Sequence, residues 1–221
     1  MDVDPQDFLK HLNNDDQYKG EIKKYWSSMA KLPRYDYSRF YSTYEDYKDV
    51  VIQGDVISDI DYAQLPKNIV KKAKCMIISS TCDIHLENTR KFPSKVLYTP
   101  LVLMSDFRAR LEKAKNQDGT PKYGQDVLEQ FFAQIRDQKI GQIFYLPKGG
   151  GLDEEAIIFF DTICSNSNNS IDRDNLESSR VVSLSAYATH IFISRLSMFF
   201  TRNTDETVSL RFSPSTEYAI S

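Results

Sequence analysis

The stretch KKAKCMIISS, residues 71–80, places a short apolar run directly behind a basic segment. An apolar run of this length, bounded by polar residues, predicts a buried strand at 75–79. Similar runs predict strands at 50–57, 95–103, 140–146, 155–163 and 179–184, whereas 60–66 and the Asn- and Ser-rich segment 165–178 are expected to be loops. Short strands without regular β-α-β alternation favour a small barrel or a curled antiparallel sheet over a doubly wound fold.

Helical patterns accompany these strands. Residues 106–115 and 125–138 are predicted helices inside an insertion at 104–139, split by the turn Asp-Gly-Thr-Pro at 118–121. Ser185 is the predicted N-cap of a last helix that runs to about Arg202, with His190 and Arg195 on its solvated face. The sequence therefore predicts an α+β fold with a mainly β core at 50–203, a helical, Tyr-rich extension at 1–49 and a tail at 204–221.

Composition limits the partners and the compartment. The chain has 221 residues and a formal net charge of −3, so no global basic field attracts nucleic acid or an anionic membrane, although 28 Lys and Arg residues allow a local basic face. Three dispersed cysteines argue against a disulfide framework. The N-terminus lacks the apolar run of a signal peptide, and no segment has the roughly 20 apolar residues of a membrane span. We expect a cytoplasmic protein without a membrane partner.

A tyrosine-dense segment follows Pro33. Its rings alternate with basic side chains, which fits a base-stacking surface; the interpretation that we favour is packing against the main domain, because aromatic rings gain much from burial. The rings belong to Tyr35, Tyr37, Phe40, Tyr41, Tyr44 and Tyr47, and the cations to Arg34, Arg39 and Lys48.

The string 79–85, Ser-Ser-Thr-Cys-Asp-Ile-His, groups several reactive side chains directly after a predicted strand. RNA cleavage at a 2′-hydroxyl needs a base, an acid and a cation that stabilises the phosphorane. Asp83 and His85 are candidates for the acid and base, and Lys72 and Lys74 for the cation, with Ser80, Thr81 and Cys82 completing the candidate site. A purely structural turn, in which Asp83 bonds backbone amides, is the open alternative.

Two other interpretations of this string are weaker. A nucleophilic Cys82 would need a paired base, for which His85 and His190 are the candidates. A zinc site from Cys75, Cys82 and His85 does not have a standard ligand spacing, so we expect no metal and no other cofactor.

Two further features involve phosphate chemistry. Lys148-Gly149-Gly150-Gly151 does not match a phosphate-loop motif and predicts a flexible hairpin, whose Lys148 could contact a phosphate at the rim of a site. Arg180 is expected to pair with Asp161 or Asp55 inside the fold, with phosphate binding as the alternative.

The order of these landmarks resembles the PemK/MazF family of toxin endoribonucleases over residues 50–202. The landmarks are Gly54-Asp55 on the first strand, the apolar run at 76–80, Tyr98-Thr99-Pro100-Leu101, a strand with Asp161, and Arg180 before a closing helix. The resemblance implies an SH3-like β-barrel that binds single-stranded RNA, a metal-independent endoribonuclease acting as a toxin or in phage defence, an antitoxin or defence-system subunit as protein partner, and a homodimer. Asp55, Ser80, Ser105, Lys148 and Arg180 are the candidate substrate-binding residues.

The sequence departs from the family at both catalytic positions. Lysines stand where the family has an arginine before the second strand, and a lysine lacks the guanidinium fork. Pro100 is followed by Leu101 and Val102 instead of a hydroxyl residue, so that the first hydroxyl is that of Ser105. The alternative function is therefore a catalytically degenerate barrel that acts as a protein-binding or regulatory module.

Overall fold

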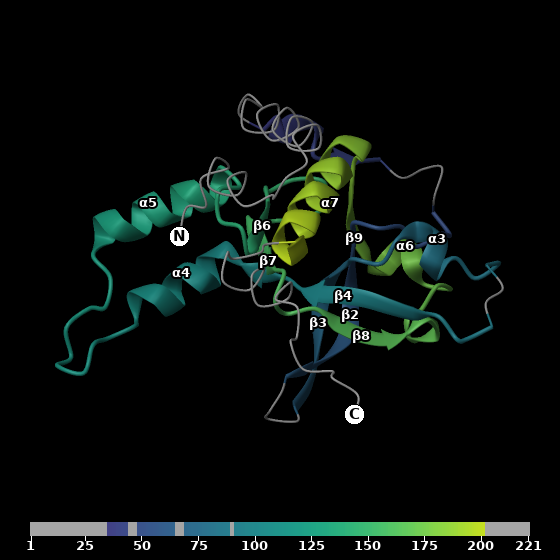
Figure 1. The fold of residues 1–221 in the computed structure, drawn as a ribbon, viewed down its shortest axis with the longest axis horizontal. Helices are drawn as coiled ribbons and strands as arrows, with labels where there is room; N and C mark the ends of the chain where they lie inside the picture. Colours follow the sequence, from purple (N-terminus) through teal and green to yellow (C-terminus); the bar gives the residue numbers. More distant parts are fainter. Residues whose placement is uncertain (1–34, 44–47, 65–68, 89–90, 202–221) are drawn as a thin grey trace, which may run out of the picture. The chain divides into compact units, whose positions relative to one another are not determined.

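Two antiparallel sheets organise the part of the chain that the computed structural model describes, residues 35–43, 48–64, 69–88 and 91–201 (Figure 1). The six-stranded sheet has the order β1 (Tyr41–Ser42), β9 (Arg180–Leu184), β2 (Asp55–Gln64), β3 (Ile69–Ile77), β4 (Lys95–Pro100) and β8 (Cys164–Ser167). The second sheet has the order β5 (Val102–Leu103), β7 (Ala156–Phe159) and β6 (Ile143–Leu146). The predicted α+β class is confirmed. Residues 36–199 form one unit, to which this description applies.

Helices occupy the connections between the strands. They are η1 (Tyr37–Arg39), α3 (Thr81–Ile84), α4 (Met104–Glu112), α5 (Gln125–Arg136), η3 (Asn168–Ser170), α6 (Leu176–Ser179) and α7 (Ala186–Thr201). Both predicted insertion helices are confirmed, and the Ser185 Oγ accepts a hydrogen bond from the Ala188 N–H at 3.2 Å, as expected of an N-cap. The predicted helices at 5–30 and the tail at 204–221 lie outside the described residues.

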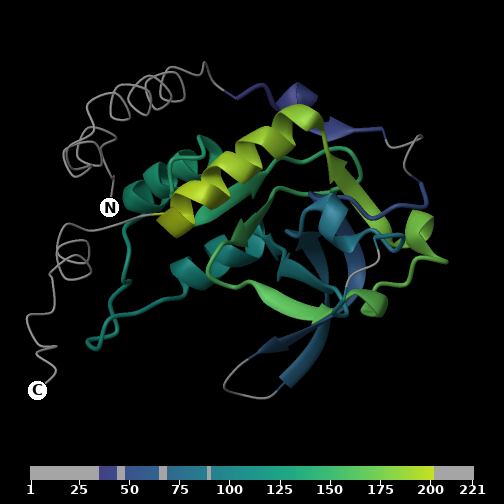
Figure 2. The same ribbon diagram turned by 45° about the vertical axis from the view of Figure 1, so that its right-hand side comes forward.

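The β2–β3 hairpin is longer than the sequence pattern predicts. Strand β2 continues to Gln64, so the loop prediction is wrong for residues 60–64, while 65 and 66 lie outside the described residues; β3 begins at Ile69. The outer part of the hairpin projects from the sheet on the side away from α7 in Figures 1 and 2. Its side chains are mostly exposed, so the apolar periodicity that marks a buried strand is absent there.

Strand β8 corrects a second loop prediction. It pairs with β4 from Cys164 to Ser167, and residues 165–167 belong to the segment expected to be a loop. An edge strand needs only one partner for its backbone, and polar side chains are tolerated there. Strand β7 ends at Phe159, so Asp161 lies in a turn and not on a strand.

An aromatic core joins α7 to the second sheet. The Phe192 ring lies 5.3 Å from the Phe144 ring, which stacks on Phe40 with 5.8 Å between ring centroids. Phe40 is fully buried and the Tyr41 hydroxyl donates to the Pro147 carbonyl at 2.6 Å. For these residues the predicted packing of the tyrosine-dense segment is confirmed; Arg34, Tyr44 and Tyr47 lie outside the described residues.

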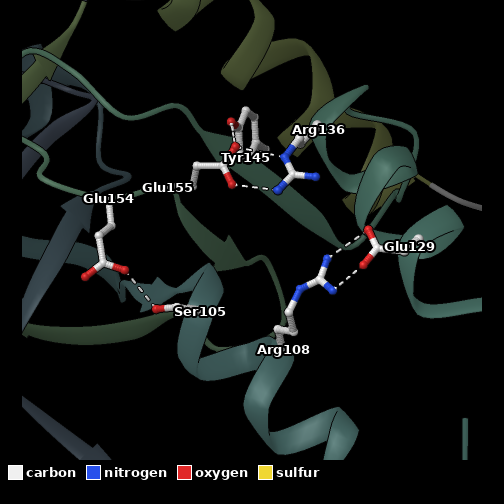
Figure 3. A network of polar contacts seen from close by, with 7 residues as sticks. All are labelled: Ser105, Arg108, Glu129, Arg136, Tyr145, Glu154 and Glu155. Carbon is white, nitrogen blue, oxygen red and sulfur yellow. Dashed lines mark hydrogen bonds and ion pairs between the residues drawn. The ribbon is translucent and has the colours of Figure 1, made fainter. Parts of the chain in front are cut away.

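The insertion helices are tied to the second sheet by charged pairs (Figure 3). The Arg136 guanidinium binds both carboxylate oxygens of Glu155 at 2.8 Å, and Tyr145 donates to the same carboxylate at 2.6 Å. Arg108 of α4 binds Glu129 of α5 in the same two-point manner. Beneath these pairs, α4 and α5 contribute Met104, Leu128, Phe132 and Ile135 to one core cluster with β6 and β7. The insertion is therefore an integral part of the fold.

A buried ion pair fixes the start of β2 against β9. Arg180 Nε lies 3.2 Å from Asp55 Oδ2, and the two side chains are 1% and 0% exposed. The second carboxylate oxygen accepts from the Ser183 hydroxyl, and the Ile52 N–H donates to Oδ2 at 2.9 Å. Burial raises the pKa of the Asp55 carboxyl, while these hydrogen bonds and the positive charge of Arg180 oppose the rise. Of the two predicted partners of Arg180, the structure selects Asp55.

Asp55→Asn should lower the free energy of unfolding by about 3–5 kcal/mol, because the amide leaves a buried guanidinium without its counter-charge. Urea denaturation measures the effect. Glu129→Gln is the matched control, since it breaks an Arg–carboxylate pair whose acidic side chain is 62% exposed, and its urea midpoint should stay near that of the wild type. Equal effects of the two variants would contradict a special role of the buried pair.

The loop after β6 needs its glycines. Leu152 N–H donates to the Gly149 carbonyl at 2.9 Å, which leaves Gly150 and Gly151 as a two-residue turn with φ of +60° and +125°. A Cβ on Gly151 would lie 2.0 Å from the Val181 carbonyl oxygen, and one on Gly150 would lie 2.8 Å from Tyr41 and Val182 side-chain atoms. The predicted hairpin is confirmed, and its backbone lies directly on β1 and β9.

Gly151→Ala should be clearly more destabilising than Gly119→Ala. Both glycines have positive φ, so each alanine adds backbone strain of about 1–3 kcal/mol. Only at Gly151 would the new methyl group also collide with backbone, because nothing lies within 4 Å of a Cβ at Gly119. Thermal unfolding of both variants checks the difference; a Gly151→Ala protein as stable as Gly119→Ala would rule out the close contact with β9.

Candidate functional site

The string 79–85 forms a tight corner at the end of β3. The Ile78 and Ser79 N–H groups donate to the Leu97 carbonyl at 2.8 and 3.3 Å, and the Leu97 N–H donates back to the Ser79 Oγ at 2.8 Å. The chain then leaves the sheet at Ser80 and enters α3, where the Asp83 N–H donates to the Ser80 carbonyl at 2.9 Å. These bonds hold Asp83 close to the exposed side of β4.

Asp83 lines a pocket of about 410 Å³ at this corner. Lys95 and Leu97 point away from the core because they alternate with the buried Val96 and Tyr98. Ser165, which lies opposite Leu97 on β8, adds a hydroxyl to the same face. The remaining wall comes from Ser79 and the segment 91–94. The volume is within the range of small-ligand sites.

Two cations and one aromatic ring line the same pocket as Asp83. Lys91 and Lys95 both line the pocket and flank Phe92, whose side chain is 80% exposed. A large exposed ring between two cations is the arrangement with which proteins stack a base and neutralise its phosphates. Sequence reasoning applied this pattern only to the tyrosine-dense segment and overlooked the string Lys-Phe-Pro-Ser-Lys at 91–95, which carries the same signal.

The other residues of the string lie beside the pocket or behind it. The Thr81 Oγ1 accepts from the Gln53 N–H at 3.0 Å, which ties α3 to the chain before β2. Cys82 is exposed, and its carbonyl accepts from Asn88 Nδ2 at 2.6 Å. The His85 Nδ1 accepts from the Glu87 N–H at 3.3 Å. Of the predicted catalytic residues, Asp83 alone belongs to the residues that line this pocket.

The two predicted lysines stand elsewhere on the sheet. The Lys74 carbonyl accepts from Leu101 N–H, while Ser79 pairs with Leu97, four residues earlier on the β4–β5 segment. At the rise of a β-strand this separation is about 13 Å. Lys72 lies farther out, opposite Asp61 on the hairpin. The structure therefore brings Lys91 and Lys95 to Asp83, and places Lys72 and Lys74 on another part of β3.

The predicted substrate-binding residues fall into separate places. Asp55 and Arg180 form the buried pair described above. The Ser105 Oγ on α4 donates to Glu154 at 2.9 Å (Figure 3), and Ser80 is exposed at the start of α3. Lys148 and Arg180 line a second pocket, between β1, the glycine loop and α6.

Neither the described residues nor known proteins give a further indication of what this site binds. Within residues 35–43, 48–64, 69–88 and 91–201, three or more His, Cys, Asp or Glu side chains nowhere gather as they would around a metal ion. None of the described helices has the length and hydrophobicity of a membrane span. No protein-family model matches this chain. No curated protein sequence is significantly similar to it.

Proposed function

We propose that this chain is a PemK/MazF-like protein that binds single-stranded RNA at the Asp83 pocket and cleaves it without a metal. The observation that carries the proposal is the grouping of Asp83, Lys91, Phe92 and Lys95 around one pocket. Single-stranded nucleic acid is held by stacking and by phosphate neutralisation, and both kinds of group are present there. The overall charge of −3 is compatible with this, because the cations act locally.

The proposed reaction uses the RNA's own 2′-hydroxyl. Asp83 takes its proton, and the 2′-oxygen attacks the adjacent phosphorus. Lys91 and Lys95 stabilise the extra negative charge of the phosphorane. The bond from phosphorus to the 5′-oxygen then breaks, the 5′-oxygen takes a proton from water, and a 2′,3′-cyclic phosphate remains. The hydroxide left by that water takes the proton held by Asp83, which restores the carboxylate. In this scheme Lys91 and Lys95 take the role that the sequence assigns to Lys72 and Lys74.

The strand order supports the family proposal. Gly54 directly precedes β2, which begins at Asp55; Pro100 ends β4, Arg180 begins β9, and α7 follows. We propose that the two sheets, joined where β4 passes into β5 at Leu101, correspond to an SH3-like barrel that is open between the described strands. The proposed setting is a bacterial toxin or phage-defence system in the cytoplasm, with an antitoxin or defence-system subunit as partner and with a homodimer as the assembled form.

A second candidate function is a protein-binding module without activity. It is favoured by the exposed apolar side chains of Phe92 and Leu97, which line the same pocket beside edge strand β8. A partner peptide could pair with that edge and cover both side chains. RNA binding and cleavage by the purified protein distinguish the two functions.

Phe92→Ala and Lys95→Ala should each weaken binding of a short, fluorescently labelled single-stranded RNA by about tenfold. Loss of one stacked base or one charge-assisted contact has this size. Fluorescence anisotropy measures it. Val127→Ala and Lys113→Ala are the controls, because they remove an exposed apolar side chain and an exposed cation from the insertion helices or their end. Equal affinity of all four variants would contradict RNA binding at this pocket.

Asp83→Asn should reduce RNA cleavage by about 10²–10⁴-fold, the usual contribution of a general base. The assay contains EDTA, and the wild type is run beside the variant. Because Asp83 is exposed, the variant should keep the urea midpoint of the wild type. Cleavage that EDTA abolishes, or that Asp83→Asn leaves unchanged, would refute the proposed mechanism. A wild type that neither binds nor cleaves RNA would support the protein-binding module instead.

A further inference from the structure

A second pocket of about 620 Å³ lies beside β1 and β9, apart from the Asp83 site. The residues that line it include Tyr37, Tyr41 and Ser42, together with Lys48, Lys148 and the glycine loop. It shares none of its lining residues with the Asp83 pocket. The proposed RNA cleavage does not involve this second pocket.

The charges around this second pocket favour an anion. Among the described residues that line this pocket, three are cationic, namely Lys48, Lys148 and Arg180, and one is acidic, Glu177. Arg180 is neutralised by Asp55, and Lys48 lies 3.7 Å from Glu177 in a pair whose acidic side chain is 80% exposed. Lys148 forms no ion pair with any residue that the structure describes. An exposed pair such as Lys48–Glu177 contributes little, so Lys48 remains available to a ligand.

The glycine loop adds backbone donors to these cations. Gly149 and Gly150 both line the pocket, and their positive φ values bring the chain against the Tyr41 ring without an intervening side chain. The Gly149 N–H donates a hydrogen bond to the Leu152 carbonyl at 3.0 Å. The Gly150 N–H makes no hydrogen bond to another described residue, so it can donate to a ligand. Backbone N–H groups beside a lysine suit a phosphate group.

Arg180 positions Lys48 through the backbone. Its guanidinium donates to the Lys48 carbonyl at 3.3 Å and to the Val50 carbonyl, while Asp55 neutralises its charge. The start of the segment 48–52 is thereby fixed to β9, and Lys48 is held at the rim of the pocket. In this arrangement Arg180 is a positioning residue and does not itself contact the ligand.

We propose that this pocket binds a phosphate-bearing ligand of about mononucleotide size, with Lys148, Lys48 and the Gly150 N–H on the phosphate. The volume lies within the range of small-ligand sites. The phosphate can belong to a free nucleotide or to the 5′-phosphorylated end of an RNA, because both present the same group. The site is independent of Asp83 and of the proposed cleavage.

Isothermal titration calorimetry with AMP tests the proposal, with adenosine as the ligand that lacks only the phosphate. AMP should bind and adenosine should not. Lys148→Ala should weaken AMP binding by about tenfold, the loss of one charge-assisted hydrogen bond, and Lys148→Arg should restore most of it. Glu177→Gln should tighten binding by about two- to threefold, since it frees Lys48 from its pair. Lys139→Ala, an exposed lysine paired with Asp137 at 3.0 Å, is the matched control and should have no effect.

A second arm identifies the source of the phosphate. The probe is a 5′-phosphorylated oligoribonucleotide. If it binds more tightly than AMP, depends on Lys148 and loses its affinity without the phosphate, the pocket binds RNA ends. If its affinity equals that of AMP, the pocket binds free nucleotides. Equal binding of AMP and adenosine, or unchanged AMP affinity in Lys148→Ala, would overturn the proposal. AMP affinity is also measured in Asp83→Asn. It should equal that of the wild type, because Asp83 does not line this pocket. The AMP result therefore stands even if the protein does not cleave RNA.

Discussion

The buried pair of Asp55 and Arg180 is the constraint on which both candidate sites depend. It holds the start of β2 to β9, and Arg180 also binds the carbonyls of Lys48 and Val50. Three residues farther along, Gln53 bonds the Thr81 hydroxyl and the Ile78 carbonyl at 3.0 and 2.6 Å. One short segment thus reaches from the rim of the second pocket to the corner that presents Asp83. A charge pair with 1% or less exposure at its centre makes this segment rigid, because leaving either charge alone is costly.

The two proposed sites would let an acidic chain attract phosphate. Net charge describes the field at a distance, and at physiological salt that field is screened within about 8 Å. What a phosphate meets inside a pocket is the set of groups around it. Lys91 and Lys95 surround Phe92 in the first pocket, and Lys148 adjoins the glycine loop in the second. Of the acidic side chains in the insertion, Glu112 and Glu129 are paired with Arg108.

Local patterns predicted the elements with strong periodicity and missed those without it. The insertion helices, the last helix with its Ser185 cap and the strand at 95–103 were recognisable because apolar residues recur at the right spacing. Strand β8 and the outer half of β2 carry polar or exposed side chains, and they are strands because a neighbouring backbone pairs with them. Arg195 was expected to be solvated, yet it is 8% exposed and donates to the Ile140 carbonyl at 2.7 Å. The sequence of the helix does not predict the Ile140 carbonyl as a hydrogen-bond acceptor, because that residue lies 55 positions away.

In the candidate site, too, the sequence did not predict which residues lie close together. Sequence spacing made Lys72 and Lys74 the natural partners of Asp83, because they precede it on one continuous stretch. A strand is extended, however, so residues nine or more positions apart along it and past its end separate quickly. Between Lys74 and Asp83 the chain turns at Ser80. Asp83 then lines the same pocket as Lys91 and Lys95, which come after it in the sequence. A cation that serves Asp83 therefore has to come from the strand that runs back past the corner, and the antiparallel pairing of β3 with β4 is what supplies it.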